Sequence, residues 1–195
     1  MCLVTKNKEG LVSDKPIVCY KLYDKDKEDG FVSPFQGTCY NLKEGDEVVA
    51  EEPEEIRESP NRGYYELGHG FIHATTERWM PVFVSREMRH LIHTILENVL
   101  SLNLDEQDID DELEETIKFL AQYYRLCEME IPAGERYWME VDMELLQKGI
   151  CSNKMIFKRE YKITKKSELL SIANRMVLSK TKIQTLIEKY KEKGE

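Results

Sequence analysis

The four histidines of this chain form two close pairs, which makes metal binding the first chemistry to test. His69 and His73 lie four residues apart in GHGFIHATTE, where the flanking glycines disfavour a helix. Residues four apart on a strand share a face but stand about 13 Å apart, too far for one ion. His90 and His93 lie three apart, with no third ligand at a suitable distance. We therefore predict no metal site and interpret His73 as a hydrogen-bonded strand residue.

Thiols are the second reactive group, and their number and spacing are informative. The chain has five cysteines, an odd number, and none of them form a C-x-x-C pair. This pattern favours neither a disulfide framework nor a zinc site. We interpret the five as reduced, mostly buried thiols of a cytoplasmic protein. They are Cys2, Cys19, Cys39, Cys127 and Cys151.

Two further expectations follow from composition. The chain has no run of about 18 apolar residues, so we expect no membrane-spanning helix and no membrane partner. It also lacks a Gly-rich phosphate loop and a serine nucleophile elbow, and we expect no bound cofactor. An enzyme is therefore the less favoured class of function.

The segment GFIHATT carries an enzymatic alternative, because it resembles the short strand of ADP-ribosyltransferase-like proteins that holds NAD. The resemblance implies that His73 contacts NAD and that an aromatic residue such as Tyr65 stacks on the nicotinamide. It further implies that a glutamate in CEMEIPAG, Glu130, holds the ribose hydroxyl and stabilises the oxocarbenium-like centre. The competing interpretation is that Glu128 and Glu130 are the solvent-facing half of an alternating strand, and we favour it.

Positive charge is concentrated at the carboxyl end of an otherwise acidic chain. The net charge is −9, yet residues 154–195 carry a net +7 and residues 1–153 a net −16. Such asymmetry is typical of a basic arm that contacts nucleic acid, and equally of a tail that docks on its own acidic body. Salt weakens both kinds of contact.

Residues 171–190 resemble a helix-turn-helix motif. Small Ala173 precedes a break, and Thr181 with Gln184 gives the spacing of a capping box that starts a second helix. In that arrangement four lysines would contact phosphates, namely Lys180, Lys182, Lys189 and Lys191. The motif usually has glycine at the turn, whereas this chain has Val177. The alternative is a helical hairpin packed on the body with its lysines facing solvent, and we favour it.

The elements that must position these residues can be predicted from periodicity. Segments 15–23, 31–42, 64–76, 126–141 and 150–163 are rich in β-branched and aromatic residues and predict strands, with 31–42 interrupted by Pro34 and Gly37. Apolar residues recur every three or four positions in 85–102 and in 105–125, which predicts two long helices. The acidic stretch 43–63 is predicted to be a loop, and two short helices are predicted after residue 164.

Together these elements predict an α+β fold: a small, mostly antiparallel sheet with two long helices inserted and a carboxy-terminal helical pair. We expect residues 1–163 to form one α+β domain, with the helical insertion at 85–125, and residues 164–195 to form a basic helical tail.

Six segments also resemble, in order, a family of uncharacterised bacterial and phage proteins. They are MCLVTKNKEG, CYKLY, SPFQGTCYNL, GFIHA, IPAGERYW and CSNKMIF. The resemblance spans residues 1–160 and implies a compact, strand-rich fold, but it transfers no catalytic residue. Residues 85–125 and the tail from 165 fall outside it.

The function that we expect is that of an accessory or binding protein. Its basic carboxy-terminal helices, residues 165–195, would contact nucleic acid or an acidic protein. An ADP-ribosyltransferase-like enzyme that uses NAD is the first alternative, and a purely structural domain is the second. The sequence leaves the oligomeric state open.

Overall fold

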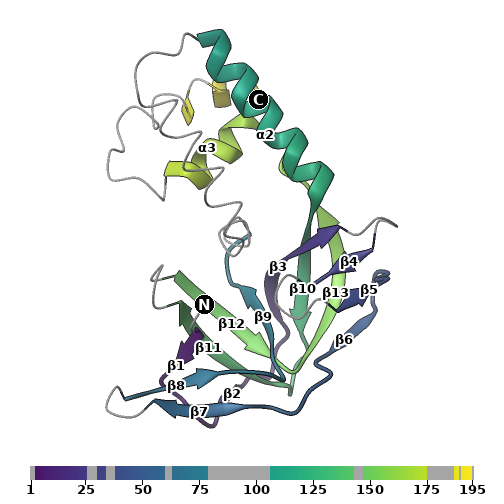
Figure 1. Ribbon diagram of the computed structural model, residues 1–195, viewed down its shortest axis with the longest axis vertical. Coiled ribbons are helices and arrows are strands. Elements are labelled where there is room, and N and C mark those ends of the chain that lie inside the picture. The colour runs from purple at the N-terminus through teal and green to yellow at the C-terminus, as the bar shows by residue number, and fades with distance from the viewer. Residues whose placement is uncertain are drawn as a thin grey trace. The chain divides into compact units, whose positions relative to one another are not determined.

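The computed structural model describes residues 3–25, 30–33, 38–59, 63–78, 106–142, 147–174, 187–188 and 190–194. Within these ranges the chain is mostly antiparallel β-sheet (Figure 1). The described helices are α2 (Glu106–Tyr123) and α3 (Lys166–Asn174), and residues 187–188 and 190–193 are also helical.

Thirteen strands make up the described sheet, and most of them are short. Their bounds are β1 Leu3–Thr5, β2 Leu11–Val12, β3 Ile17–Lys25, β4 Phe31–Val32, β5 Cys39–Tyr40, β6 Glu47–Val49, β7 Ile56–Ser59, β8 Tyr64–Leu67, β9 Ile72–Thr75, β10 Tyr124–Ile131, β11 Arg136–Asp142, β12 Gln147–Ser152 and β13 Lys154–Tyr161.

The sheet brings together strands that are distant in the sequence. Ten strands follow the order β6-β13-β10-β3-β9-β12-β11-β1-β8-β7, while β2 lies beside β11 and β4 lies between β3 and β5. The pairs β1–β11, β3–β9 and β9–β12 are antiparallel, and each joins segments more than 50 residues apart. Non-local pairing therefore organises the centre of the sheet.

The predicted fold class, an α+β domain with a small sheet, is wrong. The sheet is large because it includes short strands in polar sequence, such as β2 and β7. The predicted loop at 43–63 in fact contains β6 and β7. Strands of two to four residues carry little periodicity, and their hydrogen-bond partners lie far along the chain. The predicted helix at 85–102 and the predicted turn at Val177 lie outside the described residues.

Several individual elements are nevertheless where periodicity predicts them. The strand predicted at 15–23 is β3, and the segment predicted at 126–141 forms β10 and β11 around a turn with Gly134 at φ +84°. The helix predicted at 105–125 is α2. These elements are long enough for their apolar pattern to be read.

The chain forms two compact units, each made of three segments. Unit 1 contains residues 1–22, 40–81 and 126–160, and unit 2 contains residues 23–39, 82–125 and 161–195. Strands β3, β10 and β13 each begin in one unit and continue into the other. The predicted division of the chain at residue 163 stays a prediction.

The core of unit 1 contains an aromatic pair beside a thiol. The Phe71 and Trp138 rings meet edge to face with centroids 5.0 Å apart, and both side chains are fully buried. Leu67 and Cys151 complete the cluster. Edge-to-face pairs of this kind add about 0.5–1.5 kcal/mol beyond the burial of their apolar area.

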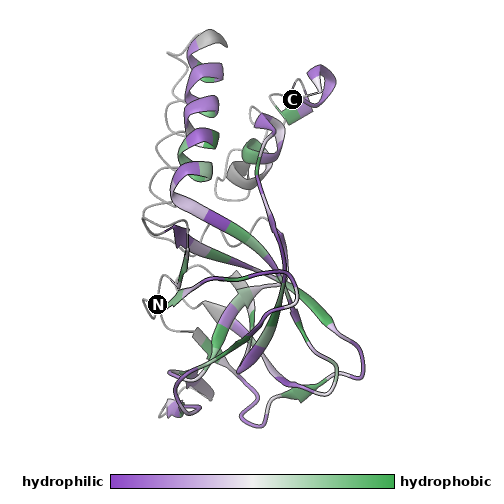
Figure 2. Ribbon diagram, turned by 90° about the vertical axis from the view of Figure 1, so that its right-hand side faces the viewer, coloured by the Kyte–Doolittle hydropathy of each residue, from purple (hydrophilic) through white to green (hydrophobic). Residues whose placement is uncertain are grey.

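Unit 2 is built on the amphipathic helix α2. Its predicted apolar stripe is buried at Ile109, Leu113 and Leu120, and Figure 2 shows hydrophilic and hydrophobic positions alternating along the helix. Near the start of α2, the Asp110 carboxylate accepts hydrogen bonds from Lys166 Nζ at 2.8 Å and from the Tyr190 hydroxyl at 2.6 Å. Hydrogen bonds to this carboxylate therefore link α3 and Tyr190 to α2.

Candidate functional site

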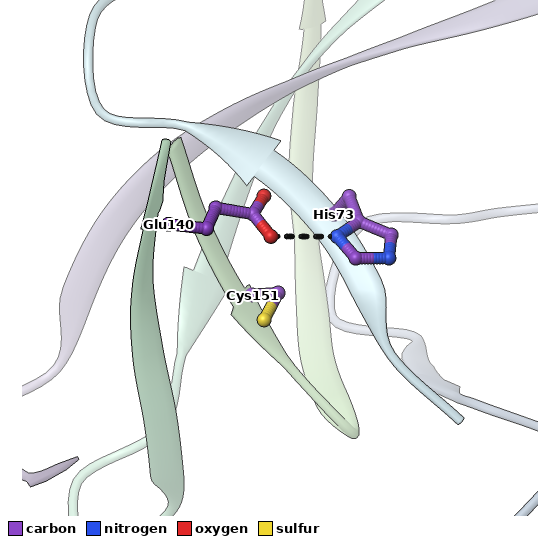
Figure 3. A group of neighbouring side chains, drawn as sticks. All are labelled: His73, Glu140 and Cys151. Atoms are coloured by element: carbon purple, nitrogen blue, oxygen red, sulfur yellow. Dashed lines mark hydrogen bonds and ion pairs between the residues drawn. The ribbon is translucent and has the colours of Figure 1, made fainter. Parts of the chain in front are cut away.

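Three neighbouring strands of unit 1 bring His73, Glu140 and Cys151 together (Figure 3). His73 lies on β9 directly opposite Cys151 on β12, and Cys151 lies opposite Trp138 on β11. Glu140 is two residues along β11 from Trp138, so its side chain projects from the same face. The pleat and the register alone therefore place an imidazole, a carboxylate and a thiol side by side.

The three groups are close enough to act on one atom. His73 Nδ1 lies 2.8 Å from Glu140 Oε2, and one ligand atom from each of the three residues lies within 4.8 Å of the others. The Glu140 side chain is only 1% exposed and that of His73 is 16% exposed. We call these three residues the His-Glu-Cys cluster.

A glycine makes room for the carboxylate of this cluster. Gly149 on β12 lies opposite Glu140 on β11. A Cβ atom at position 149 would lie 2.8 Å from both Cγ and Oε1 of Glu140, which is closer than real Cβ contacts. Because Gly149 has no side chain, the Glu140 carboxylate can lie across β12 and reach the His73 ring.

A buried lysine lies beside the cluster. Lys21 on β3 is 6% exposed, and its Nζ donates to the main-chain oxygen of His73 at 2.9 Å. Burial lowers the pKa of this ammonium to about 8, while Glu140 favours the charged form. Lys21 therefore supplies positive charge close to the buried carboxylate.

The thiol of the cluster is kept in its protonated form. Burial, and the neighbouring Glu140 carboxylate, raise the pKa of Cys151 well above its usual range. The thiolate is the nucleophilic form of cysteine. The raised pKa therefore disfavours Cys151 as a nucleophile at neutral pH.

A pocket of about 560 Å³ opens next to the cluster, and Glu140 belongs to both. The pocket lies between β11 and the segment that joins β1 to β2. Strand β1 pairs with residues 141–142 of β11 and β2 pairs with residues 136–137, and residues 138–140 between these pairings line the pocket. Its lining is Val4, Thr5, Lys6, Asn7, Gly10, Leu11, Tyr64, Trp138, Met139 and Glu140.

The wall of this pocket is held by hydrogen bonds. The Asn7 side chain donates to the main-chain oxygen of Gly10 at 2.9 Å and accepts from the main-chain nitrogen of Glu9 at 3.0 Å. Trp138 Nε1 donates to the main-chain oxygen of Lys8 at 3.1 Å. Residues 7–10 are therefore held against β11 by hydrogen bonds within the protein.

No protein-family model, curated protein or solved structure is significantly similar to this chain. The resemblance of residues 1–160 to bacterial and phage proteins stays a prediction, and so do the local resemblances to ADP-ribosyltransferases and to helix-turn-helix motifs. The function proposed below therefore rests on the geometry of the residues.

The residues predicted for an NAD-using enzyme have separate partners. The Glu130 carboxylate lies 3.4 Å from Lys158 Nζ, and His73 pairs with Glu140. Tyr65 is on β8, where it pairs with Thr5 of β1 and Glu58 of β7. No described contact joins Glu130, His73 and Tyr65 to one another. The NAD-using alternative stays a prediction.

The basic tail is described only in part. Lys180, Lys182 and Lys189 lie outside the described residues, while Lys191 is exposed. Ile187 and Tyr190 are 3% and 1% exposed, so these two side chains of the segment are buried. No described helix is both long and apolar enough to cross a membrane.

Sequence reasoning singled out His73 but missed Glu140, Cys151 and Lys21. The four residues come from four different strands, and no spacing within one segment connects them. One usable signal was GICS at 149–152, because a glycine within a strand often marks a close approach by another group. As predicted, most of the described cysteines are buried: Cys19, Cys127 and Cys151 are, whereas Cys39 is exposed, and none of these four forms a disulfide.

Proposed function

We propose that this protein is a binding protein whose unit 1 takes a small ligand in the pocket between residues 4–11 and β11. The observation that carries the proposal is a pocket of about 560 Å³ lined largely by apolar side chains. Ligand pockets typically have volumes of about 300–1,000 Å³ and few polar groups.

Exposed apolar side chains at the pocket support the proposal. Leu11 and Met139, which line it, are 43% and 42% exposed, and the neighbouring Val12 is 63% exposed. Large apolar side chains gathered at a concave site mark places where another molecule binds. Burying them under a ligand would remove their surface from water, worth about 25 cal/mol per Å².

The chemistry of the ligand follows from the polar residues of the lining. Lys6 is exposed and is the one Lys or Arg among the described residues that line the pocket, whereas Glu140 is already paired with His73. We therefore propose a ligand with an apolar body and an anionic group. The body would contact Leu11, Tyr64 and Met139, and the anion would pair with the Lys6 ammonium.

Two fluorescent probes that differ in charge test this assignment. Anilinonaphthalene sulfonate has an apolar body and an anionic group, while N-phenyl-1-naphthylamine has a similar body without charge. We expect Met139→Gln to weaken both probes by roughly tenfold, since a polar side chain would replace buried apolar contact. We expect Lys6→Gln to weaken only the sulfonate, by roughly two- to fivefold, as an exposed ion pair is worth about 0.2–1 kcal/mol.

Val49→Asn is the matched control, because Val49 is an equally exposed apolar residue of unit 1, on β6, outside the pocket. It should leave both affinities unchanged. Near-ultraviolet circular dichroism confirms that each variant keeps its packed aromatic core. An equal loss of probe affinity in Met139→Gln and Val49→Asn would show that the probes bind nonspecifically. That result would contradict the assignment of the pocket as the ligand site.

We keep nucleic acid binding by the basic tail as a second candidate function. Lys162, Lys165 and Lys191 are exposed in unit 2, which supports a cationic surface there. Lys166 is paired with Asp110, and this favours the competing view of a tail docked on its own acids.

Charge reversal tests this candidate without removing any buried residue. We expect Lys162→Glu, Lys165→Glu and Lys191→Glu together to shift elution from heparin or immobilised single-stranded DNA to lower salt. The control reverses three exposed lysines of unit 1, at positions 8, 15 and 43, and so has the same net charge. An identical shift in both triple variants would mean that only net charge matters and would remove this candidate.

We also propose a cytoplasmic location. None of the four described cysteines forms a disulfide, which fits a reducing compartment.

A further inference from the structure

We infer that His73, Glu140 and Cys151 form a binding site for one Zn²⁺ ion. This inference goes beyond the ligand pocket and rests on a different observation, the convergence of three ligating side chains from β9, β11 and β12 in the interior of unit 1.

The spacing of the three groups suits one small cation. Zinc sites in proteins are tetrahedral, with bonds of about 2.0–2.3 Å, so their ligand atoms stand roughly 3.5 Å apart. Here one ligand atom from each of the three residues lies within 4.8 Å of the others. The 2.8 Å between His73 Nδ1 and Glu140 Oε2 is shorter because a hydrogen bond joins them. Small side-chain rotations would convert this arrangement to the metal-bound one.

The identity of the ligands selects the metal. Imidazole nitrogen, thiolate sulfur and carboxylate oxygen are all established zinc ligands, and a set of three leaves a fourth position for water or another molecule. Calcium and magnesium prefer oxygen ligands alone, and thiolate sulfur disfavours both.

Charge balance favours zinc in this buried place. A neutral imidazole, a carboxylate and a thiolate around Zn²⁺ give a complex of zero net charge, which is far less costly to bury than a charged one. The Lys21 ammonium beside it keeps its hydrogen bond to the main-chain oxygen of His73. Binding requires the Cys151 thiol to release its proton to solvent, and the sulfur lone pair then forms the bond to zinc. The proton that His73 Nδ1 donates to Glu140 leaves that nitrogen, and the neutral ring carries its proton on Nε2 instead. Nδ1 and the carboxylate oxygen then each bind the metal in place of their hydrogen bond, and no electrons are transferred.

The main chain is built so that the carboxylate reaches the site. Gly149 leaves the space that the Glu140 side chain crosses on its way to His73. A methyl group at 149 would meet the carboxylate and push it away from the other two ligands. Gly149 is therefore a positioning residue for the metal site although it offers no ligand.

Metal binding to the purified full chain tests the inference. After treatment with a chelator, the protein should take up one equivalent of Zn²⁺, measured by competition with a fluorescent chelator and by elemental analysis. Co²⁺ bound in its place should show a thiolate-to-metal charge-transfer band together with the intense visible bands of four-coordinate cobalt. Both bands report the ligands directly, independently of any activity.

Three variants assign the site. Cys151→Ser should abolish the charge-transfer band, and Gly149→Ala should weaken zinc binding by roughly 10- to 100-fold, as loss of a ligand's support typically does. Cys39→Ser, which alters an exposed cysteine elsewhere, should bind zinc like the parent protein. Circular dichroism in the near ultraviolet confirms that the core around Trp138 is intact in each.

Absence of stoichiometric zinc binding to the parent protein would overturn the inference. So would an unchanged charge-transfer band in Cys151→Ser, or its loss in Cys39→Ser. Met139→Gln separates this inference from the ligand pocket, because it should weaken the naphthalene probes and leave zinc affinity unchanged.

Discussion

At the scale of single residues, Gly10 decides the shape of the pocket. Its φ is +72°, a left-handed conformation that favours glycine. A Cβ there would also lie 2.7 Å from Cε2 of Trp138 and 2.9 Å from Cγ of Arg136. The chain can therefore pass over the indole of Trp138 only because position 10 has no side chain.

This close approach makes a prediction for Gly10→Ala. The substitution should lower the free energy of unfolding by about 1–2 kcal/mol for the left-handed backbone and by about 1–3 kcal/mol more for the crowding of Trp138. Urea unfolding followed by tryptophan fluorescence measures it. Gly45→Ala is the control, since Gly45 has a φ of +91° and a Cβ added there would meet nothing within 4 Å, so it should show only the backbone cost. Equal costs in the two variants would contradict the contact with Trp138.

The same scale shows why the site was only partly predictable. Periodicity places His73 on a strand, and its environment could be expected to be hydrogen bonded. Its partner Glu140 lies 67 residues away, and their meeting depends on β9, β12 and β11 being neighbours in the sheet. The local sequence does not determine the order of strands in a sheet. The Glu140 carboxylate in RYWMEV could therefore not be distinguished from a solvent-facing one.

At the scale of elements, the Asp110 carboxylate links the helices of unit 2 by hydrogen bonds. Asp110 accepts from Lys166 and from Tyr190, and these two hydrogen bonds lower its pKa below the ordinary value of 3.8. A carboxyl group whose pKa is depressed by folding stabilises the folded state above its ordinary pKa. That stability is lost as the pH falls through the lower, folded-state pKa.

Asp110→Asn should therefore destabilise the helices of unit 2 at neutral pH, by about 1–2 kcal/mol for the lost charged hydrogen bonds. The difference from the parent protein should shrink as the pH falls below 3.8, because the parent carboxyl is then itself protonated. Urea unfolding followed by far-ultraviolet circular dichroism at several pH values measures this. Glu115→Gln, on the exposed face of α2, should show no such pH dependence. A constant difference across pH in Asp110→Asn would contradict the assignment.

Elements also differ in how well the sequence predicts them. Helix α2 and strands β3, β10 and β13 have eight or more residues, and each shows its period clearly. Strands β1, β2 and β4 have two or three residues, and a period cannot be read over so short a length. They are strands because they form hydrogen bonds with neighbouring strands of the sheet. The predicted fold class is therefore wrong, although several of the predicted elements are correct.

At the scale of the whole molecule, the segregation of charge does not by itself define a binding arm. Part of the basic segment belongs to unit 2, where Leu169, Leu170 and Tyr190 are buried. Removing residues 165–195 would expose apolar surface of unit 2 and unfold that unit. A loss of nucleic acid binding would then not report on the lysines. This is why charge reversal at exposed lysines is the cleaner test of nucleic acid binding.

We propose that the pocket beside β11 is where this protein binds a ligand. Carbon-13 labelling of the methionine methyl groups tests it most directly, because Met139 lines the pocket while Met129 and Met155 are buried elsewhere in unit 1. On titration with anilinonaphthalene sulfonate, the Met139 methyl resonance should shift and saturate, with Met129 and Met155 unchanged. A Met139 resonance that stays in place while the probe binds, or equal shifts at all three methionines, would contradict the claim.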